Sequence, residues 1–220
     1  LKRLTATHGY VTSDWGYNMK TAWFNKEILP KSMLNSGFKP LDLSEHFPSL
    51  KKCFEGIPPT TLLDIGCGAA EVSQAFSDFD YTGVDLPHVI EEVAKKKNPH
   101  KKYIHFDANK GPYEFVKNHD IVLMNSFISE VPNWYFALSN ILYRSKKYVI
   151  IHRQEVTNDK TSVEDYITYG GLKTTKTVIN YSELLNLFEM SGFKLINDQS
   201  SFPNENNVRT FLLKKQEKME

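Results

Sequence analysis

The sequence of 220 residues has no long hydrophobic run, and none of its apolar stretches approaches the roughly 20 residues that a membrane-spanning helix needs. Its opening residues, Leu1-Lys2-Arg3-Leu4-Thr5, also lack the apolar core of a secretion signal. These absences predict a cytoplasmic chain with no membrane partner.

The sequence also has few cysteines and no excess of charge of one sign. The two cysteines, Cys53 and Cys67, lie in unrelated contexts and predict neither a disulfide framework nor a pair of metal ligands, which favours a reducing compartment. No His/Asp/Glu cluster has metal-site spacing, so no metal is expected. The 27 basic and 26 acidic residues leave a net charge of +1, which disfavours a nucleic-acid partner.

What the sequence does contain, after Pro58-Pro59, is an alternation of short apolar runs with segments of helical periodicity. The first run, residues 61–65, ends in Gly66-Cys67-Gly68 and is followed by helical spacing. Further runs occupy residues 81–85, 103–106, 121–124 and 148–151, with a helix near residues 134–142. This pattern predicts βαβ units and an α/β fold whose mostly parallel sheet is covered on both faces.

The two ends of the chain differ from this repeat. Residues 1–56 predict short helices broken by turns, a helical cap or lid whose aromatic residues suit core packing or stacking on a ligand equally well; they are Tyr10, Trp15, Tyr17 and Trp23. A helix over residues 182–191, with Ser182 as its N-cap, precedes an antiparallel pair at residues 193–196 and 208–213. The main domain is expected over residues 57–215, with a flexible tail at 216–220.

Polar residues and glycines end or follow the predicted strands. In an open parallel sheet, ligands bind outside the carboxyl ends of the strands, so these residues are expected to line one site. They are Asp64, Gly66, Cys67, Gly68, Asp85, Asp107, Asn125, Ser126, His152 and Arg153. Glycines let the backbone approach a ligand closely, and Asp85 is placed to accept the hydroxyl hydrogens of a ribose.

An acidic residue decides between two nucleoside ligands. A dinucleotide fingerprint requires a third glycine where this sequence has Glu71, and a carboxylate is unfavourable beside a diphosphate. Asp64 and Glu71 suit a ligand that carries an ammonium group and a sulfonium, because carboxylates attract positive charge. The sequence therefore favours S-adenosylmethionine (SAM) over a nicotinamide cofactor.

The segment Leu62-Leu-Asp-Ile-Gly-Cys-Gly-Ala-Ala-Glu71 resembles the first signature of class I SAM-dependent methyltransferases, and Thr82-Gly-Val-Asp-Leu86 resembles the second. Phe106-Asp-Ala108 and Asp120-Ile-Val-Leu-Met-Asn-Ser126 continue the resemblance, which covers about residues 60–215. It implies a Rossmann-like three-layer sandwich with a seven-stranded sheet and an antiparallel last strand. It also implies a SAM site formed by Asp64, Gly66, Cys67, Gly68, Asp85, Leu86, Asp107, Ala108, Asn125 and Ser126.

The sequence departs from this family in two places. Ala69-Ala70 replaces the usual Thr-Gly or Ser-Gly, and no Asn-Pro-Pro-Tyr-like motif of nucleic-acid or glutamine amino methylases follows the fourth strand. Residues 148–153 with Tyr169-Gly-Gly171 have a faint similarity to bacterial methyltransferases of surface-polysaccharide gene sets.

Two residues are candidates for a general base that would deprotonate an acceptor hydroxyl. His152 ends the fifth strand, and an imidazole titrates near neutral pH; the alternative is that it bonds the backbone at the strand end. Glu130 lies near the start of the helix after the fourth strand, where the alternative is that an acid stabilises the helix dipole. The predicted function is O-methylation of a small-molecule or sugar acceptor. The alternatives are N-methylation, a SAM-binding sensor or assembly protein without activity, and a nicotinamide-dependent oxidoreductase.

Overall fold

The computed structural model describes residues 22–35, 40–168 and 171–216. Tyr10, Trp15 and Tyr17 of the predicted lead-in, Tyr169, and residues 217–220 of the predicted tail lie outside these ranges.

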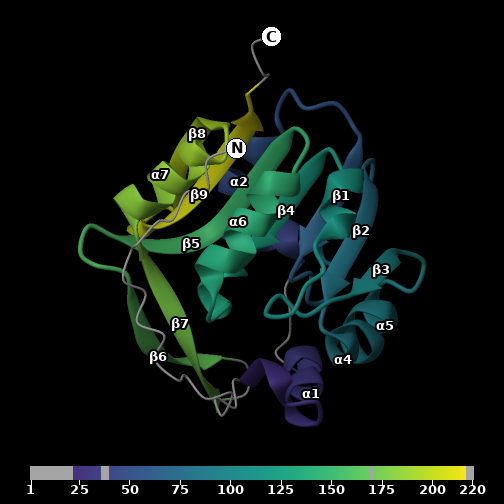
Figure 1. The fold of residues 1–220 in the computed structure, drawn as a ribbon. Helices are drawn as coiled ribbons and strands as arrows, with labels where there is room; N and C mark the ends of the chain where they lie inside the picture. The colour runs from purple at the N-terminus through teal and green to yellow at the C-terminus, as the bar shows by residue number, and fades with distance from the viewer. Residues whose placement is uncertain (1–21, 36–39, 169–170, 217–220) are drawn as a thin grey trace.

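A nine-stranded sheet forms the centre of the described chain (Figure 1). The strands are β1 (Thr61–Ile65), β2 (Asp80–Asp85), β3 (Lys102–His105), β4 (Ile121–Asn125), β5 (Tyr148–Thr157), β6 (Ser162–Thr168), β7 (Leu172–Asn180), β8 (Phe193–Phe202) and β9 (Glu205–Lys215). The first five lie in the order β3-β2-β1-β4-β5, and every pairing among them is parallel. Because parallel strands end at the same edge, this order brings together the segments after β1, β2, β3 and β4.

The last strand runs against its neighbours. β9 pairs antiparallel with both β5 and β8, so the predicted reversal is confirmed, and with it the mostly parallel α/β class. The predicted count of seven strands is too low, because β6 and β7 form an additional antiparallel hairpin next to the last part of β5. Most of β6 is exposed on both faces, so its sequence lacks the apolar alternation that marks a strand.

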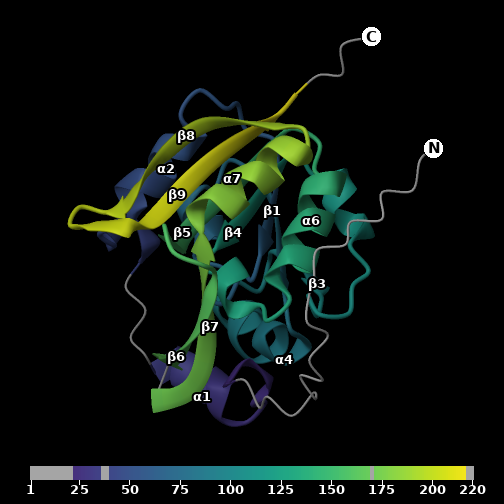
Figure 2. The same ribbon diagram turned by 60° about the vertical axis from the view of Figure 1, so that its left-hand side comes forward.

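Helices cover both faces of the sheet, as Figure 2 shows for α6 and α7 on one side and α2 on the other. The helices are α1 (Ile28–Asn35), α2 (Phe47–Phe54), α3 (Val72–Ala75), α4 (Pro87–Val89), α5 (Lys95–Lys97), α6 (Trp134–Arg144) and α7 (Tyr181–Met190). Shorter 3-10 segments are η1 (Ala22–Phe24), η2 (Leu41–Leu43), η4 (Glu114–Asn118) and η5 (Ile128–Glu130), and η3 (Ile90–Ala94) is a π-helical turn. No helix of the described chain is both long and apolar enough to cross a membrane.

The core is divided between the two faces by the alternation of side chains along each strand. Val122 and Met124 of β4 pack in the cluster that contains α6 and α7 residues, whereas Ile121 and Leu123 pack in the cluster that contains α2 residues. Side chains two apart in a strand share a face, so a single strand contributes to both layers. The sheet is thereby a rigid platform for its polar edge.

The cap of helix α7 differs from the prediction. Asn180 is the N-cap, and its side-chain oxygen accepts the backbone N–H of Glu183 at 2.9 Å. The assignment of Ser182 as N-cap is wrong, because β7 runs directly into α7 and the helix begins at Tyr181. An Asn at this position satisfies one of the unpaired N–H groups of the first turn.

The predicted helical cap is split between two places. Helix α2 packs into the sheet core through Leu50, Cys53 and Phe54. Helix α1 contacts α4 and η3, and its Leu29 and Met33 pack against Ala69 beside the glycine-rich turn. In Figure 1 the β6–β7 hairpin extends from the end of β5 toward α1. The domain boundary at residue 56 stays a prediction.

Candidate active site

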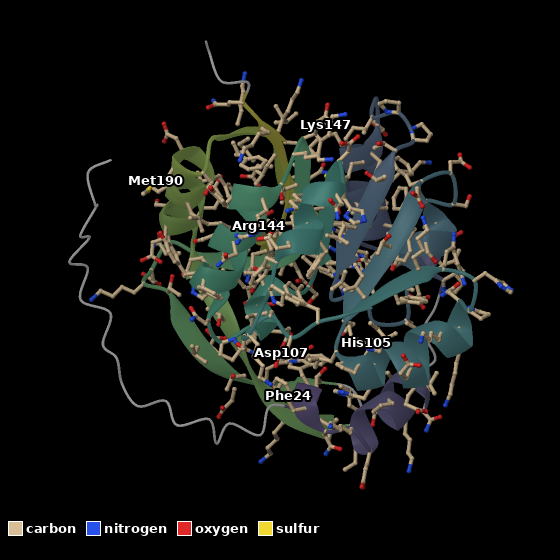
Figure 3. The ribbon with its side chains drawn as sticks, turned by 45° about the vertical axis from the view of Figure 1, so that its right-hand side comes forward. Phe24, His105, Asp107, Arg144, Lys147 and Met190 are labelled. Carbon is tan, nitrogen blue, oxygen red and sulfur yellow. The ribbon has the colours of Figure 1, made fainter. Side chains whose placement is uncertain are left out.

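A pocket of about 430 Å³ opens at the carboxyl ends of the parallel strands. This volume lies in the range of pockets that bind small molecules and cofactors. In Figure 3, Asp107 and Phe24, which both line the pocket, lie at one end of the molecule, and Lys147 lies at the opposite end. All ten residues of the predicted SAM site line this pocket; they are Asp64, Gly66, Cys67, Gly68, Asp85, Leu86, Asp107, Ala108, Asn125 and Ser126.

The turn after β1 forms the floor of the pocket. Gly66 has a φ of +78° and Gly68 a φ of +53°, a region that disfavours other residues. A Cβ on Gly66 would lie 2.5 Å from Cδ2 of Phe127, so this position also has no room for a side chain. The backbone N–H groups of Gly66 and Cys67 both donate to the Val84 carbonyl, which fixes the turn against β2.

Asp85 joins the ends of β1 and β2. One carboxylate oxygen accepts the N–H of Gly68 at 2.8 Å and the other accepts the N–H of Leu86 at 2.7 Å. Burial raises the pKa of Asp85 to about 6, and these two hydrogen bonds oppose the rise. Each oxygen has a second lone pair, so the carboxylate can also accept hydroxyl hydrogens of a ligand.

Asp64 is a buried acid with an unused oxygen. Its Oδ2 accepts the hydroxyl of Tyr81 at 2.8 Å, while its buried Oδ1 has no hydrogen-bond partner. Burial raises the pKa of Asp64 to about 7, and the charge of Asp85 adds to the rise. A buried acceptor without a partner is costly, so this oxygen suits a cationic donor on a ligand.

The edge of the pocket after β3 holds Asp107 and Ala108. Asp107 accepts the N–H of Asn109 at 3.0 Å, and the Lys110 ammonium lies 3.1 Å from its other oxygen. Tyr113 donates to the Ala108 carbonyl at 2.6 Å, which ties the turn to the core. These contacts within the protein therefore fix the conformation of the acidic turn.

The end of β4 is linked to β5. Asn125 accepts a hydrogen bond from Nε of Arg153 at 2.8 Å, and the N–H of Ser126 donates to the His152 carbonyl at 2.8 Å. Ser126 and Arg153 have φ values of +53° and +57°. Backbone in this region is unfavourable for residues with a Cβ and is often retained at functional sites.

Glu130, one of the two predicted base candidates, faces the pocket from η5. Its Oε2 accepts the indole N–H of Trp23 at 3.0 Å. Burial raises the pKa of Glu130 to about 7; the Trp23 hydrogen bond and the charges of Lys176 and Arg153 oppose the rise. A carboxylate with this pKa can accept a proton near neutral pH.

His152 does not face the pocket, so its predicted placement is wrong. It is fully buried, with Nε2 2.9 Å from Nδ1 of His46 and Nδ1 2.7 Å from Oγ1 of Thr210. Burial holds its pKa well below the usual value. The register of β5 against β9 shifts between Ile151 and Gln154, and this irregularity turns Arg153 instead of His152 toward the pocket.

The pocket is also lined by Arg153, which the sequence placed at this edge without a role, and by Trp23, for which it left core packing and ligand stacking open. Arg153 follows a predicted strand end, so its position was a usable signal. Trp23 lies 107 residues from Glu130, and nothing in the sequence pairs them.

Acidic groups dominate the described lining. Its carboxyl groups belong to Asp64, Glu71, Asp85, Asp107 and Glu130, and its guanidinium to Arg153. Such a lining suits a ligand with an ammonium and a sulfonium better than one with a diphosphate. The unpartnered Asp64 oxygen and the glycine turn with no room for a Cβ therefore fit SAM. Among the residues described, no group of three or more His, Cys, Asp or Glu is arranged to hold a metal ion.

Residues 63–147 match the family model described as "Methyltransferase domain". A search of curated proteins finds no match to this chain.

Solved structures of methyltransferases share the fold. SAM-bound CalS10, an amino pentose methyltransferase from Micromonospora echinaspora, is 11% identical, with 86% of this chain and 97% of that chain covered and a TM-score of 0.62. Burkholderia thailandensis 1,6-didemethyltoxoflavin-N1-methyltransferase, crystallised with S-adenosylhomocysteine, is 15% identical, with 87% of each chain covered and a TM-score of 0.61. SAM-bound magnesium protoporphyrin IX methyltransferase from Synechocystis PCC 6803 is 10% identical, with 86% of this chain and 81% of that chain covered and a TM-score of 0.56.

The domain match identifies a methyltransferase domain over residues 63–147, and the chain shares the fold of the solved SAM-bound methyltransferases. The chain thus carries a methyltransferase domain, and the lining of its pocket fits S-adenosylmethionine as the methyl donor.

Proposed function

We propose that this enzyme methylates a hydroxyl group of a small molecule or sugar, with Glu130 as the general base. The observation that carries the proposal is the Glu130 carboxyl group, which lines the same pocket as Asn125 and Ser126 and has a pKa of about 7. The amino pentose methyltransferase CalS10 shares the fold, which is consistent with a sugar-sized acceptor.

The predicted cofactor residues have distinct roles in this proposal. Asp85 would accept hydrogen bonds from the ribose hydroxyls, Asp107 and Ala108 would hold the adenine, and Oδ1 of Asp64 would accept a hydrogen bond from the ammonium group. The backbone of Gly66, Cys67 and Gly68 would hold the methionine moiety, Leu86 would hold the ribose, and Asn125 and Ser126 would border the methyl group. When bound, SAM supplies an electrophilic methyl group on a sulfonium.

The acceptor then occupies the part of the pocket near Glu130. Trp23, which contacts Glu130, lines the pocket together with Phe24, Tyr166 and Ile167. Apolar and aromatic walls orient a substrate and exclude water, which is most of what transfer from a sulfonium requires. Glu130 accepts the hydroxyl proton at Oε1, because its Oε2 accepts the Trp23 indole N–H.

The experiment measures S-adenosylhomocysteine formation across matched hydroxyl and amine acceptors, with NMR assignment of the methylated atom. Glu130→Gln should lower kcat on the best acceptor by about 10²–10⁴-fold and leave the affinity for S-adenosylhomocysteine unchanged. The control is Glu92→Gln, since Glu92 is exposed and pairs with Lys96 outside the pocket. Full turnover by the Glu130 variant would refute the role of this base.

An amine acceptor is the second candidate, because the acidic lining also attracts an ammonium group. Methyl found on nitrogen would establish it. Tight SAM binding with no product on any acceptor would support the non-catalytic alternative.

A further inference from the structure

Trp23 makes hydrogen bonds on two sides of the pocket. Its indole N–H donates to Oε2 of Glu130 at 3.0 Å, and its backbone carbonyl accepts Nε2 of His88 at 2.8 Å. Glu130 belongs to η5, which follows β4, and His88 belongs to α4, which follows β2. One residue of η1 therefore connects the segment that carries the proposed base with the segment next to Asp85.

The indole contact favours the ionised form of Glu130 and so opposes burial, which raises the pKa of this group. An indole N–H is a donor only, so it stabilises the carboxylate and cannot take up a proton from it. It also engages one of the two carboxylate oxygens, so the side chain can reach an acceptor through Oε1. Burial is the largest influence on the pKa of Glu130 and raises it. The Trp23 hydrogen bond is the largest of the three influences that oppose this rise, and the other two are the charges of Lys176 of β7 and Arg153 of β5.

The backbone contact explains how the indole is held. A carbonyl oxygen can only accept, so His88 donates from Nε2, and burial favours its neutral form by lowering its pKa. Trp23 is half-buried, and it packs with the cluster of Leu29, Met33 and Val89. The indole is thus anchored from the cofactor side of the pocket.

We infer that Trp23 is a positioning residue for Glu130: it orients the carboxylate for proton transfer, and the His88 contact makes that orientation depend on η1 lying across the pocket. The inference rests on the proposed role of Glu130 as the base. It differs from simple stacking, because the indole N–H and not the aromatic surface carries the effect.

The test uses Trp23→Phe, which keeps an aromatic ring and removes the N–H donor. A ¹³C NMR titration of the Glu130 carboxyl, with the protein saturated by S-adenosylhomocysteine, should show its pKa raised by roughly one unit. The acid limb of the kcat–pH profile should move upward by a similar amount. The control is Trp134→Phe, since Trp134 packs beside Tyr135 and does not line the pocket.

An unchanged Glu130 pKa in a folded Trp23→Phe variant would overturn the inference. If this variant does not fold, the wild-type indole N–H signal of Trp23 provides the same test. That signal should shift with pH as Glu130 titrates, and a signal that does not shift overturns the inference. Full turnover by Glu130→Gln would refute the base instead, so the two failures are distinguishable.

Discussion

Nδ1 of His46, which precedes α2, lies 2.9 Å from Nε2 of His152 in β5, and the ring of His152 is fully buried whereas that of His46 is half-buried. Nδ1 of His152 lies 2.7 Å from the hydroxyl of Thr210, which in turn lies 2.8 Å from the hydroxyl of Ser201. The hydroxyl oxygen of Ser201 accepts a hydrogen bond from the backbone N–H of Arg153. The chain of polar contacts supports the backbone from which Arg153 reaches the pocket.

This arrangement predicts a structural role for His152. Replacing it with Ala should lower the free energy of unfolding by about 2–4 kcal/mol, because the change leaves a cavity and removes a hydrogen-bond partner from both His46 and Thr210. Thermal unfolding should occur roughly 5–15 °C lower. His105→Ala is the control, since His105 is an exposed histidine bonded to Glu91, and its stability should barely change. Unaltered stability of the His152 variant would contradict the assigned role.

The same pair predicts sensitivity to acid. Burial lowers the pKa of His46 to about 4 and that of His152 well below its usual value. The unfolded chain therefore binds protons that the folded chain does not, so stability falls as the pH drops below about 6.5. Urea unfolding at pH 7.5 and 5 should show this loss. The loss should be smaller in His46→Gln, and an equal loss in that variant would argue against the pair.

The pKa of Asp64 predicts pH-dependent cofactor binding. With a pKa of about 7, the free protein holds a proton on Asp64 in mildly acidic solution, and an ammonium group requires the carboxylate. The dissociation constant for S-adenosylhomocysteine, measured by calorimetry, should rise by up to about tenfold per pH unit below pH 7. Asp85, whose pKa is about 6, steepens the dependence below that pH.

Asp64→Asn should bind S-adenosylhomocysteine weakly, and its dissociation constant should no longer change with pH near pH 7. Because the folded-state pKa of Asp64 is raised, its burial destabilises the ligand-free protein increasingly as the pH rises from about 4 to 7. The variant should therefore unfold at a higher temperature than the wild type at pH 8. A lower unfolding temperature would contradict this explanation.

Asp85 gives a test of the ribose contact. Asp85→Ala should abolish the thermal stabilisation by SAM, because it removes the ribose acceptor and the partner of two backbone N–H groups. Asp80→Ala is the matched control at the other end of β2, where Asp80 forms an exposed pair with Lys102. Retained stabilisation in the Asp85 variant would argue against the proposed cofactor site.

A side chain at Gly66 should destabilise the protein in two ways, through its backbone conformation and through a clash with Phe127, and a second glycine separates the two effects. Gly66→Ala should lose both stability and cofactor affinity, because its φ of +78° is unfavourable and its Cβ would meet Phe127. Gly192 has a φ of +76° with nothing within 4 Å of a Cβ, so Gly192→Ala measures the backbone cost alone. Equal unfolding temperatures for the two variants would show that Phe127 imposes no constraint.

The sequence by itself determined the class of fold and the collection of residues around the pocket. Gly66, Asp85, Asp107 and Asn125 end or follow strands of a parallel sheet, and the ends of such strands must meet at one edge. Local patterns were sufficient here because strand, turn and helix signals lie within a few residues of one another.

Only the tertiary structure decided which candidate base faces the pocket. One irregularity in β5 places His152 in the core and Arg153 at the pocket, and sequence periodicity cannot show a shift of one residue. The contact of Trp23 with Glu130 spans 107 residues, and it forms because η1 and η5 both pack against β7. The fold class followed from local periodicity, whereas the chemistry of the acceptor side depends on contacts between distant segments.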